Sequence, residues 1–439
     1  MGTLIMIGQV ILGLSILIIL HELGHFLAAR AFGIKVEKFY LFFDAWGVKL
    51  FKFTYKDCEY GIGWLPLGGY VKISGMIDES MDTEQLKQDP QPWEFRSKPA
   101  WQRLIVMLGG IIVNVIVGIV VFWMMTFNYG ENDIDNSKLQ YGVVPGIIGK
   151  EIGIQAGDKI LAVNGKPAVK FFGDVMSSEV LMGDAVLSIE RGGKQQELKV
   201  PADILNAVAE HKKNEFVSPR HTLNSVQEVS KGSEAERMQV MKGDSIIAVN
   251  GQPTRFYDEF TAALKNNVGK AIDVTLIRGG EQVVLKGNVD STAALGVNLG
   301  EIDFPVIVQK YGFIESLPIG ANKALSVVTD NIKGFGKIFK GDVRADKALS
   351  GPVGIAKMFG TEVNWVKFWS LVGMLSMALA FMNLLPIPAL DGGHVIFLIV
   401  EMIQGKPLSD NFLEKAQMVG FFILIALMIF TLGNDIIKW

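Results

Sequence analysis

The sequence predicts a multi-pass α-helical membrane protein with four spans, a β-rich region close to the membrane, and two copies of an α+β domain between the second and third spans. Three observations support this class: four long uncharged runs, a repeated segment, and a composition of 49% hydrophobic and 20% charged residues. A soluble domain of this size would carry more charge. The 42 basic and 45 acidic residues nearly balance, so the chain offers no electrostatic footprint for nucleic acid. The single cysteine, Cys58, excludes an internal disulfide.

Four runs without a charged residue are long enough to cross a hydrocarbon core of about 30 Å at a rise of about 1.5 Å per helical residue. They cover residues 1–20, 104–127, 368–390 and 416–434. A cleaved signal peptide is the alternative for the first run, but it has no positively charged start and no small-residue cleavage site. We therefore expect membrane helices at 1–32, 101–127, 363–391 and 412–436.

Basic residues near the ends of the first two spans indicate the orientation. The loop between these spans begins and ends with Arg30, Lys35, Lys38, Arg96, Lys98 and Arg103, whereas the first thirteen residues carry no charge. By the positive-inside rule, residues 21–103 and 391–415 face the cytoplasm and both termini face outward. The segment 128–362 also faces outward, because long loops translocate regardless of their charge.

The long outer segment contains an internal repeat. Residues 154–167 recur as residues 240–253, 86 positions later. Each copy runs from a Gly-Asp turn through a short apolar strand to Asn-Gly, and an Arg-Gly-Gly turn follows at Arg191 or Arg278. Each copy is therefore expected to form one domain.

This repeated pattern resembles tandem PDZ domains of the bacterial type, which we expect at 141–204 and 215–300. Such domains bind an extended peptide at a sheet edge. In the first copy, Tyr141-Gly-Val-Val144 occupies the place of the binding loop. Alternatively, the two copies are packed sheets that only shield the membrane face.

The inner end of the first span carries the sequence His21-Glu22-Leu23-Gly24-His25. On a helix, the i, i+4 spacing puts both imidazoles on one face, where they can chelate one metal ion beside Glu22. Zinc with an open position lowers the pKa of bound water, and an adjacent carboxylate can act as the general base. Satisfied interfacial polar residues are the alternative, but three ionisable groups beside a span are hard to explain by packing. We expect His21 and His25 to bind zinc and Glu22 to be catalytic.

A catalytic zinc site needs a third protein ligand, and Asp391 is the candidate at comparable depth. It follows Pro386 and Pro388, which interrupt the third span, and it precedes two glycines. A broken helix at membrane depth is tolerated only where its backbone lines protein or a water-filled cavity, so we expect the site to admit water. The alternative for Asp391 is a helix-terminal carboxylate facing the cytoplasm. His394 is expected to lie at the surface or behind the ligands.

His-Glu-x-x-His with a bound zinc is the motif of a metalloprotease. Cleavage of a peptide within lipid would expose backbone groups of the unwound substrate, and each unsatisfied group costs several kcal/mol. The region 33–100 can supply partners, because residues 47–53 and 59–74 are typical of short strands. Its apolar part, residues 61–71, contains Gly68 and Gly69 and can dip into the bilayer. We expect this membrane-associated β-hairpin to pair with substrate; an ordinary cytoplasmic hairpin is the alternative.

Residues 313–345 are expected to contain an amphipathic helix on the outer membrane surface. Its apolar positions recur at gaps of three or four, with lysines elsewhere on the helix. They are Leu317, Ala321, Ala324, Val328, Ile332, Phe335 and Phe339. Packing against the repeated domains is the alternative.

Together these motifs resemble the site-2 protease family of intramembrane zinc metalloproteases. The resemblance rests on the His-Glu-Leu-Gly-His motif, the segment 383–392, the four spans and the paired PDZ-like insertion, and it covers essentially the whole chain. It implies that His21, His25 and Asp391 hold one Zn²⁺ and that Glu22 activates water.

The resemblance also implies where substrate binds. Asn383 would contact the substrate backbone, within the same segment as Pro386 and Pro388. The β-hairpin with Gly68 and Gly69 would be re-entrant. Single-span membrane proteins, such as anti-sigma factors or remnant signal peptides, would be the substrates, cut near the cytoplasmic face of a bacterial inner membrane.

The sequence departs from the family pattern at two places. The second span reads Gly110-Ile-Ile-Val-Asn114, without the proline that often follows the glycine, and Phe42-Phe43-Asp44 stands where Gly-Phe-Gly is common. These changes affect the backbone near the substrate path, so we give Asn114 only a supporting role in substrate binding. A polar residue that bridges two helices is the alternative.

We therefore predict a zinc metalloendopeptidase whose outer PDZ-like pair, in the periplasm, excludes substrates with bulky outer domains. A membrane-anchored PDZ adaptor with a structural metal site is one alternative, but such a site needs a closed fourth ligand rather than a base. A zinc transporter is the other, but only one proline-broken span is present where inverted repeats are expected.

Overall fold

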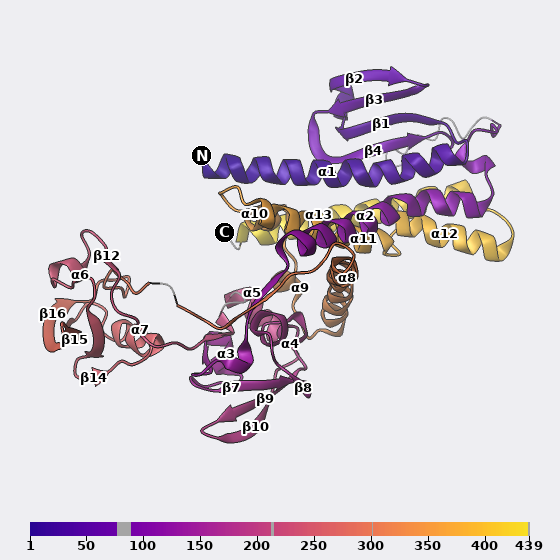
Figure 1. Cartoon of the computed structure of the whole chain (residues 1–439). Coiled ribbons are helices and arrows are strands. Elements are labelled where there is room, and N and C mark those ends of the chain that lie inside the picture. Colours follow the sequence, from indigo (N-terminus) through magenta and orange to yellow (C-terminus); the bar gives the residue numbers. More distant parts are fainter. Residues whose placement is uncertain (77–88, 212–214, 301, 438–439) are drawn as a thin grey trace. The chain divides into compact units, whose positions relative to one another are not determined.

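The computed structural model describes residues 1–76, 89–211, 215–300 and 302–437. Part of the predicted β region, residues 77–88, therefore lies outside the described residues. The chain divides into two compact units, one made of residues 1–131 and 309–439 and the other of residues 132–308. Figure 1 labels the helices and strands of both units.

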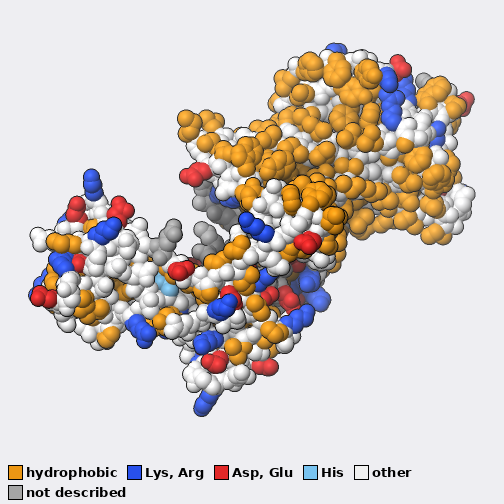
Figure 2. Space-filling view, viewed as in Figure 1, with side chains coloured by type: hydrophobic (Ala, Val, Ile, Leu, Met, Phe, Trp, Pro, Cys, Tyr) orange, Lys and Arg blue, Asp and Glu red, His pale blue; other side chains and the backbone are white. Residues whose placement is uncertain are grey.

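Four described helices of the first unit are long and apolar enough to cross a membrane, as predicted. They are α1 (Gly2–Ala31), α2 (Ala100–Tyr129), α11 (Trp365–Leu384) and α13 (Asp410–Ile437). Figure 2 shows hydrophobic side chains over much of the visible face of this unit. The chain is thus a multi-pass membrane protein.

The third span is interrupted, as its two prolines predicted. Within the expected segment 363–391, α11 ends at Leu384 and a new helix, α12 (Asp391–Gln404), begins at Asp391. The cause is the pair Pro386 and Pro388, which lack the N–H groups that a continuing helix needs. The break turns Asp391 into the first residue of a helix.

Helix α2 lies at the centre of the first unit and packs against α1, α8 (Ser316–Lys340), α11 and α12. Its closest approach to α1 is at two glycines: a Cβ atom added to Gly24 would overlap the backbone of Gly109, and one added to Gly109 would overlap that of Gly24. Small residues permit this approach. The crossing presses the His-Glu-x-x-His turn of α1 against α2.

A four-stranded sheet in the order β2-β3-β1-β4 lies beside α1. Its strands are β1 (Val36–Phe43), β2 (Lys49–Tyr55), β3 (Cys58–Gly63) and β4 (Leu65–Ile73). We expected only a hairpin from residues 47–53 and 59–74. The second segment instead divides into β3 and β4, and β1 inserts between them, pairing parallel to β3 and antiparallel to β4. As a result β4 is an edge strand.

One polar cluster ties three of these strands together. Lys49 and the Tyr40 hydroxyl both donate to the Glu59 carboxylate over 2.6 Å. The hydrogen bond from Lys49 is the main cause that lowers the pKa of Glu59 to about 2. Glu59 therefore stays ionised and keeps β1, β2 and β3 in register.

Helix α8 contacts α2 through small residues. Its buried residues are Ser316, Gly320 and Ala324, and a Cβ atom on Gly320 would overlap the backbone of Trp123 in α2. Ile332 and Phe339, two of the apolar positions expected at the membrane surface, are 55% and 86% exposed. Small residues form the contact because they let two helices approach closely, so the large apolar side chains remain free to meet lipid.

The second unit contains two four-stranded sheets with the same arrangement. The first has the order β10-β9-β7-β8 and the second the order β14-β13-β15-β16. Their strands are β7 (Lys159–Val163), β8 (Lys166–Pro167), β9 (Val186–Arg191), β10 (Lys194–Lys199), β13 (Ser245–Val249), β14 (Gln252–Pro253), β15 (Ala271–Arg278) and β16 (Glu281–Asn288). The sequence repeat is therefore a structural repeat.

The same ion pair explains the recurring sequence signature. The Arg191 side chain donates twice to Asp158, over 2.8 and 2.6 Å, and Arg278 donates twice to Asp244, over 2.8 and 2.7 Å. Both aspartate side chains are 1% exposed. Arg278 also lowers the pKa of Asp244. Since an unpaired buried carboxylate is strongly destabilising, the Gly-Asp and Arg-Gly-Gly turns recur together.

The boundary between the two copies is later than predicted. Strand β11 (Val217–Pro219) pairs with β6 (Val143–Pro145), and Phe216 and Val217 are buried in the first hydrophobic core. The second copy therefore does not begin at residue 215. Non-local strand pairing decides this boundary, and the local pattern does not reveal it.

The remaining helices and strands are short. The helices are α3 (Ile147–Glu151), α4 (Ser178–Leu181), α5 (Ile204–His211), α6 (Glu234–Arg237), α7 (Tyr257–Lys265), α9 (Ala345–Ala348) and α10 (Pro352–Phe359). The strands are β5 (Glu131–Ile134), β12 (Glu228–Val229), β17 (Val297–Asn298) and β18 (Val306–Gln309). β12 pairs with β17, and β5 with β18.

Candidate metal centre

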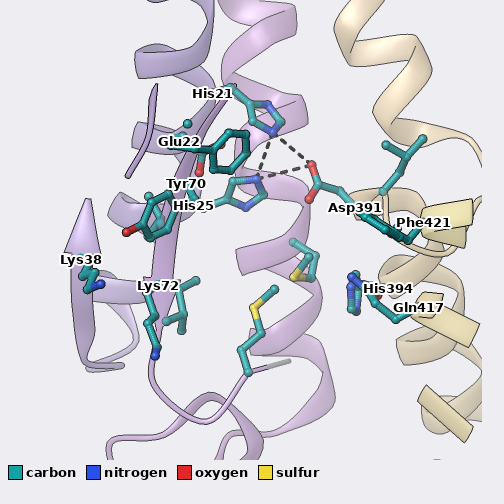
Figure 3. A pocket seen from close by; sticks show the side chains of 18 of the residues that line it. His21, Glu22, His25, Lys38, Tyr70, Lys72, Asp391, His394, Gln417 and Phe421 are labelled. Carbon is teal, nitrogen blue, oxygen red and sulfur yellow. Dashed lines mark hydrogen bonds and ion pairs between the residues drawn. The ribbon is translucent and has the colours of Figure 1, made fainter. Parts of the chain in front are cut away.

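Three side chains from two distant parts of the chain converge in the first unit (Figure 3). Nε2 of His21 lies 3.3 Å from Oδ2 of Asp391, and Nε2 of His25 lies 3.4 Å from the same oxygen. The two Nε2 atoms are 3.3 Å apart. The three atoms thus form a nearly equilateral triangle.

This triangle fits a tetrahedral zinc ion. A tetrahedron with edges of 3.3 to 3.4 Å has its centre about 2.0 to 2.1 Å from each corner, which is the usual zinc–nitrogen and zinc–oxygen distance. Oδ2 of Asp391 is buried and has no hydrogen-bond partner among the described residues. Two imidazoles and one carboxylate are also a known catalytic donor set for zinc, with the fourth position open.

Helix α2 holds the two imidazoles in place. Nδ1 of His25 lies 2.8 Å from the carbonyl oxygen of Val106, and Nδ1 of His21 lies 3.1 Å from the side-chain amide of Asn114. Between them, Gly110 provides the space for both rings, because an added Cβ atom would overlap His25 and His21. Both Nε2 atoms then lie within 3.4 Å of Oδ2 of Asp391.

The helix break positions Asp391. Ala389 has a φ of 80°, a conformation that residues with side chains rarely adopt, and it turns the chain into α12. A Cβ atom on Gly392 would overlap the backbone of Leu385, and one on Gly420 in α13 would overlap the carbonyl of Pro388. The broken segment thus needs glycine at two contacts, at Gly392 next to it in sequence and at Gly420 of α13, which packs against it.

A cavity of about 640 Å³ opens at this cluster. Besides the three converging side chains, Glu22 and the edge strand β4 line it, and the backbone of Val71 faces the Glu22 carboxylate. The β4 residues of the lining are Leu65, Gly69, Tyr70, Val71, Lys72 and Ile73. A carboxylate, three candidate metal ligands and a sheet edge therefore share one space.

Most other predicted residues lie near this space, but not all contact it. The Asn383 amide is 3.2 Å from Nε2 of His21. Gly69 lines the cavity, whereas Gly68 packs against the Phe43 ring, where an added Cβ atom would come within 2.7 Å. Pro386 and Pro388 are absent from the lining formed by the described residues, and they act by breaking the helix.

Asn114 requires a correction. We expected it to support substrate binding, but its side chain is fully buried and contacts His21 instead. His394, expected behind the ligands, lines the cavity and hydrogen-bonds Gln417, and it is not part of the converging cluster.

The sequence analysis did not identify two features that orient the histidine rings. The doublet Gly109-Gly110 in an apolar span was a usable signal for close helix packing. The Val106 carbonyl belongs to the backbone, which every residue has, so the sequence gives no sign of its role.

Comparison with known proteins agrees with this geometry. The model of peptidase family M50 matches residues 9–427, nearly the whole chain, so the chain belongs to this family. It is therefore a zinc metalloprotease of the site-2 type, with Zn²⁺ as its cofactor.

Individual relatives align over almost their full lengths. The chain is 29% identical over 451 residues to the regulator of sigma-E protease RseP of Escherichia coli (strain K12), covering 98% of both chains. It is 28% identical over 457 residues to the regulator of sigma E protease of Haemophilus influenzae, again covering 98% of both. A putative zinc metalloprotease of Vibrio cholerae is 29% identical over 454 residues, with 97% of both covered.

Removing one converging side chain should remove the metal. We expect His25→Ala and Asp391→Asn to lower bound zinc from about one ion per chain to a small fraction, because two ligands hold zinc far more weakly than three. The measurement is elemental analysis of the purified protein. His394→Ala, in the same helix as Asp391, is the matched control and should retain its zinc. Zinc retained by Asp391→Asn, or lost equally from His394→Ala, would contradict the assignment.

Proposed function

We propose that this protein cleaves single-span membrane proteins within the bilayer, with His21, His25 and Asp391 as the zinc ligands and Glu22 as the general base. The observation that carries the proposal is the triangle of donor atoms with edges of 3.3 to 3.4 Å, formed beside Glu22 at the end of a membrane helix. Family membership supplies the reaction class, and this cluster supports the assignment of residues.

The chemistry is hydrolysis of a peptide bond. A bound zinc ion supplies a Lewis acid that polarises water and the scissile carbonyl. Glu22 takes one proton from the attacking water while the water oxygen bonds to the carbonyl carbon of the substrate. The carbon–nitrogen bond then breaks, and Glu22 returns the proton to the leaving amine. The Asn383 amide, next to His21, is available to donate to the substrate backbone.

Edge strand β4 is the proposed partner of the unwound substrate. A helix must open before its carbonyls can be attacked, and its freed backbone groups then need replacement hydrogen bonds in lipid. Among the described strands, β4 pairs with β1 alone. Its five residues from Gly69 to Ile73 line the cavity. Substrate added to this edge would extend past Glu22.

The location and selectivity are also proposals. The relatives are named as regulators of sigma-E, which favours membrane-bound regulators such as anti-sigma factors, with remnant signal peptides as the other substrate class. We assign the protein to a bacterial inner membrane, the metal site to its cytoplasmic side and residues 132–308 to the periplasm. Two PDZ-like domains there would admit only substrates already trimmed outside, and could bind extended peptide.

Replacing the base tests the catalytic assignment. We expect Glu22→Gln to lower the cleavage rate of a single-span test substrate by about 10²- to 10⁴-fold, since the amide cannot accept the proton. The assay is product formation in detergent or vesicles, with zinc content measured in parallel. Full activity in the variant would contradict the assignment of Glu22 as the base. Loss of zinc from the variant would instead indicate that Glu22 is a zinc ligand.

Cross-linking tests whether the substrate pairs with edge strand β4 in an extended conformation. In a Cys58→Ala background, a cysteine at Val71 should form disulfides with substrate cysteines at alternate positions, because side chains in an extended strand alternate between faces. Electrophoresis of the trapped complexes gives the pattern. A spacing of three to four residues would mean that substrate stays helical and would contradict pairing with β4. Bulky replacements of Gly68 or Gly69 are less informative, since they would collide with Phe43 or with Ile18 and Tyr40.

Removing the two PDZ-like domains tests whether they exclude substrates with bulky outer domains. Replacing residues 135–305 with a short Gly-Ser turn retains β5 and β18 but removes both PDZ-like domains. We expect the shortened chain to cleave a substrate that still has its bulky outer domain, while the intact chain leaves it uncut. A trimmed substrate serves as the control and should be cut by both. Continued protection of the untrimmed substrate would contradict the gate.

A further inference from the structure

Helix α2 contacts the metal cluster through three consecutive turns of one face. Val106, Gly110 and Asn114 are spaced by four residues, so their positions lie one above the other. Val106 contacts His25 by its carbonyl oxygen, Gly110 makes room for both rings, and Asn114 contacts His21. This face therefore decides how both imidazoles are oriented.

The contact with Val106 fixes the tautomer of His25. A carbonyl oxygen can only accept a hydrogen bond, so the 2.8 Å contact requires the proton to be on Nδ1 of His25. Nε2 then presents a lone pair toward Asp391 and His21. This is the tautomer that binds a metal ion through Nε2.

The same requirement applies to His21, whose Nε2 also faces the cluster. If Nε2 presents a lone pair there, Nδ1 carries the proton and needs an acceptor. The Asn114 atom that lies 3.1 Å from Nδ1 is Nδ2, which can only donate. Asn114 is fully buried, and its Oδ1 has no hydrogen-bond partner among the described residues. Turning the amide over gives Oδ1 that partner, and the orientation of an amide follows from its hydrogen bonds.

We propose that Asn114 is a positioning residue for zinc, whose side-chain oxygen accepts the Nδ1 proton of His21 and so keeps Nε2 available to the metal. The same contact joins α2 to α1, whereas Ser376 of α11 donates to the backbone oxygen of Asn114, over 2.8 Å. The proposal rests on the proposed zinc site but not on its catalytic activity.

Zinc affinity tests the proposal independently of cleavage. In full-length protein carrying Glu22→Gln, which removes proteolysis, zinc binding is measured by competition with a chelator. Asn114→Leu has a similar volume but no acceptor, and we expect it to weaken zinc binding about 10- to 100-fold, the usual effect of losing such a partner. Asn114→Asp keeps an acceptor oxygen and should remain within a few-fold of the parent.

The matched control is Ser376→Ala, which removes the neighbouring hydrogen bond to the backbone and should leave zinc affinity unchanged. Parent-like affinity in Asn114→Leu would overturn the proposal. Equal weakening in the leucine and aspartate variants would also overturn it, because the acceptor would then not be the cause.

A second measurement needs no substitution at Asn114 and remains decisive if the leucine variant does not fold. Nitrogen-15 NMR of histidine-labelled, zinc-loaded protein reports which ring nitrogen carries the proton, and a His21→Ala sample assigns the signals. We expect His21 to be protonated at Nδ1 and metal-bound at Nε2. Protonation at Nε2 would overturn the proposal.

Discussion

The candidate metal centre of the first unit depends on keeping two imidazoles and a carboxylate within about 3.4 Å of one another beside the lipid. Such groups are costly to bury without a charge partner or a metal, so their positions must be fixed by other contacts. The close crossing at Gly24 and Gly109 provides that, because it brings the histidine turn of α1 within hydrogen-bonding distance of α2. A side chain at either glycine would separate the helices and the cluster with them.

The third converging side chain, Asp391, follows a segment that is not helical. Proline at 386 and 388 ends α11, and the chain turns at Ala389 before α12 begins with Asp391. An unbroken helix would carry Asp391 further along the span axis. The freed backbone is acceptable because the segment borders a cavity and packs under Gly420 of α13. The same break therefore places Asp391 beside the two imidazoles and lets the segment border the cavity.

Local patterns predicted those parts of the fold that local physics determines. Uncharged runs predicted four spans, and the i, i+4 histidines with Asp391 identified three side chains that do converge. Non-local contacts were beyond such patterns: the parallel pairing of β1 with β3, the inclusion of Phe216 in the first outer core, and the small-residue contact of α8. Asn114 was noticed for its motif, but its contact depends on which face of α2 meets His21.

X-ray absorption at the zinc edge of the purified, zinc-loaded protein tests the central claim most directly, because it reads the ligands without relying on activity. The account predicts four-coordinate zinc with two imidazoles and oxygen ligands at about 2.0 Å, and no sulfur. A spectrum with one imidazole or none, or with a sulfur ligand at about 2.3 Å, would contradict a site built from His21, His25 and Asp391.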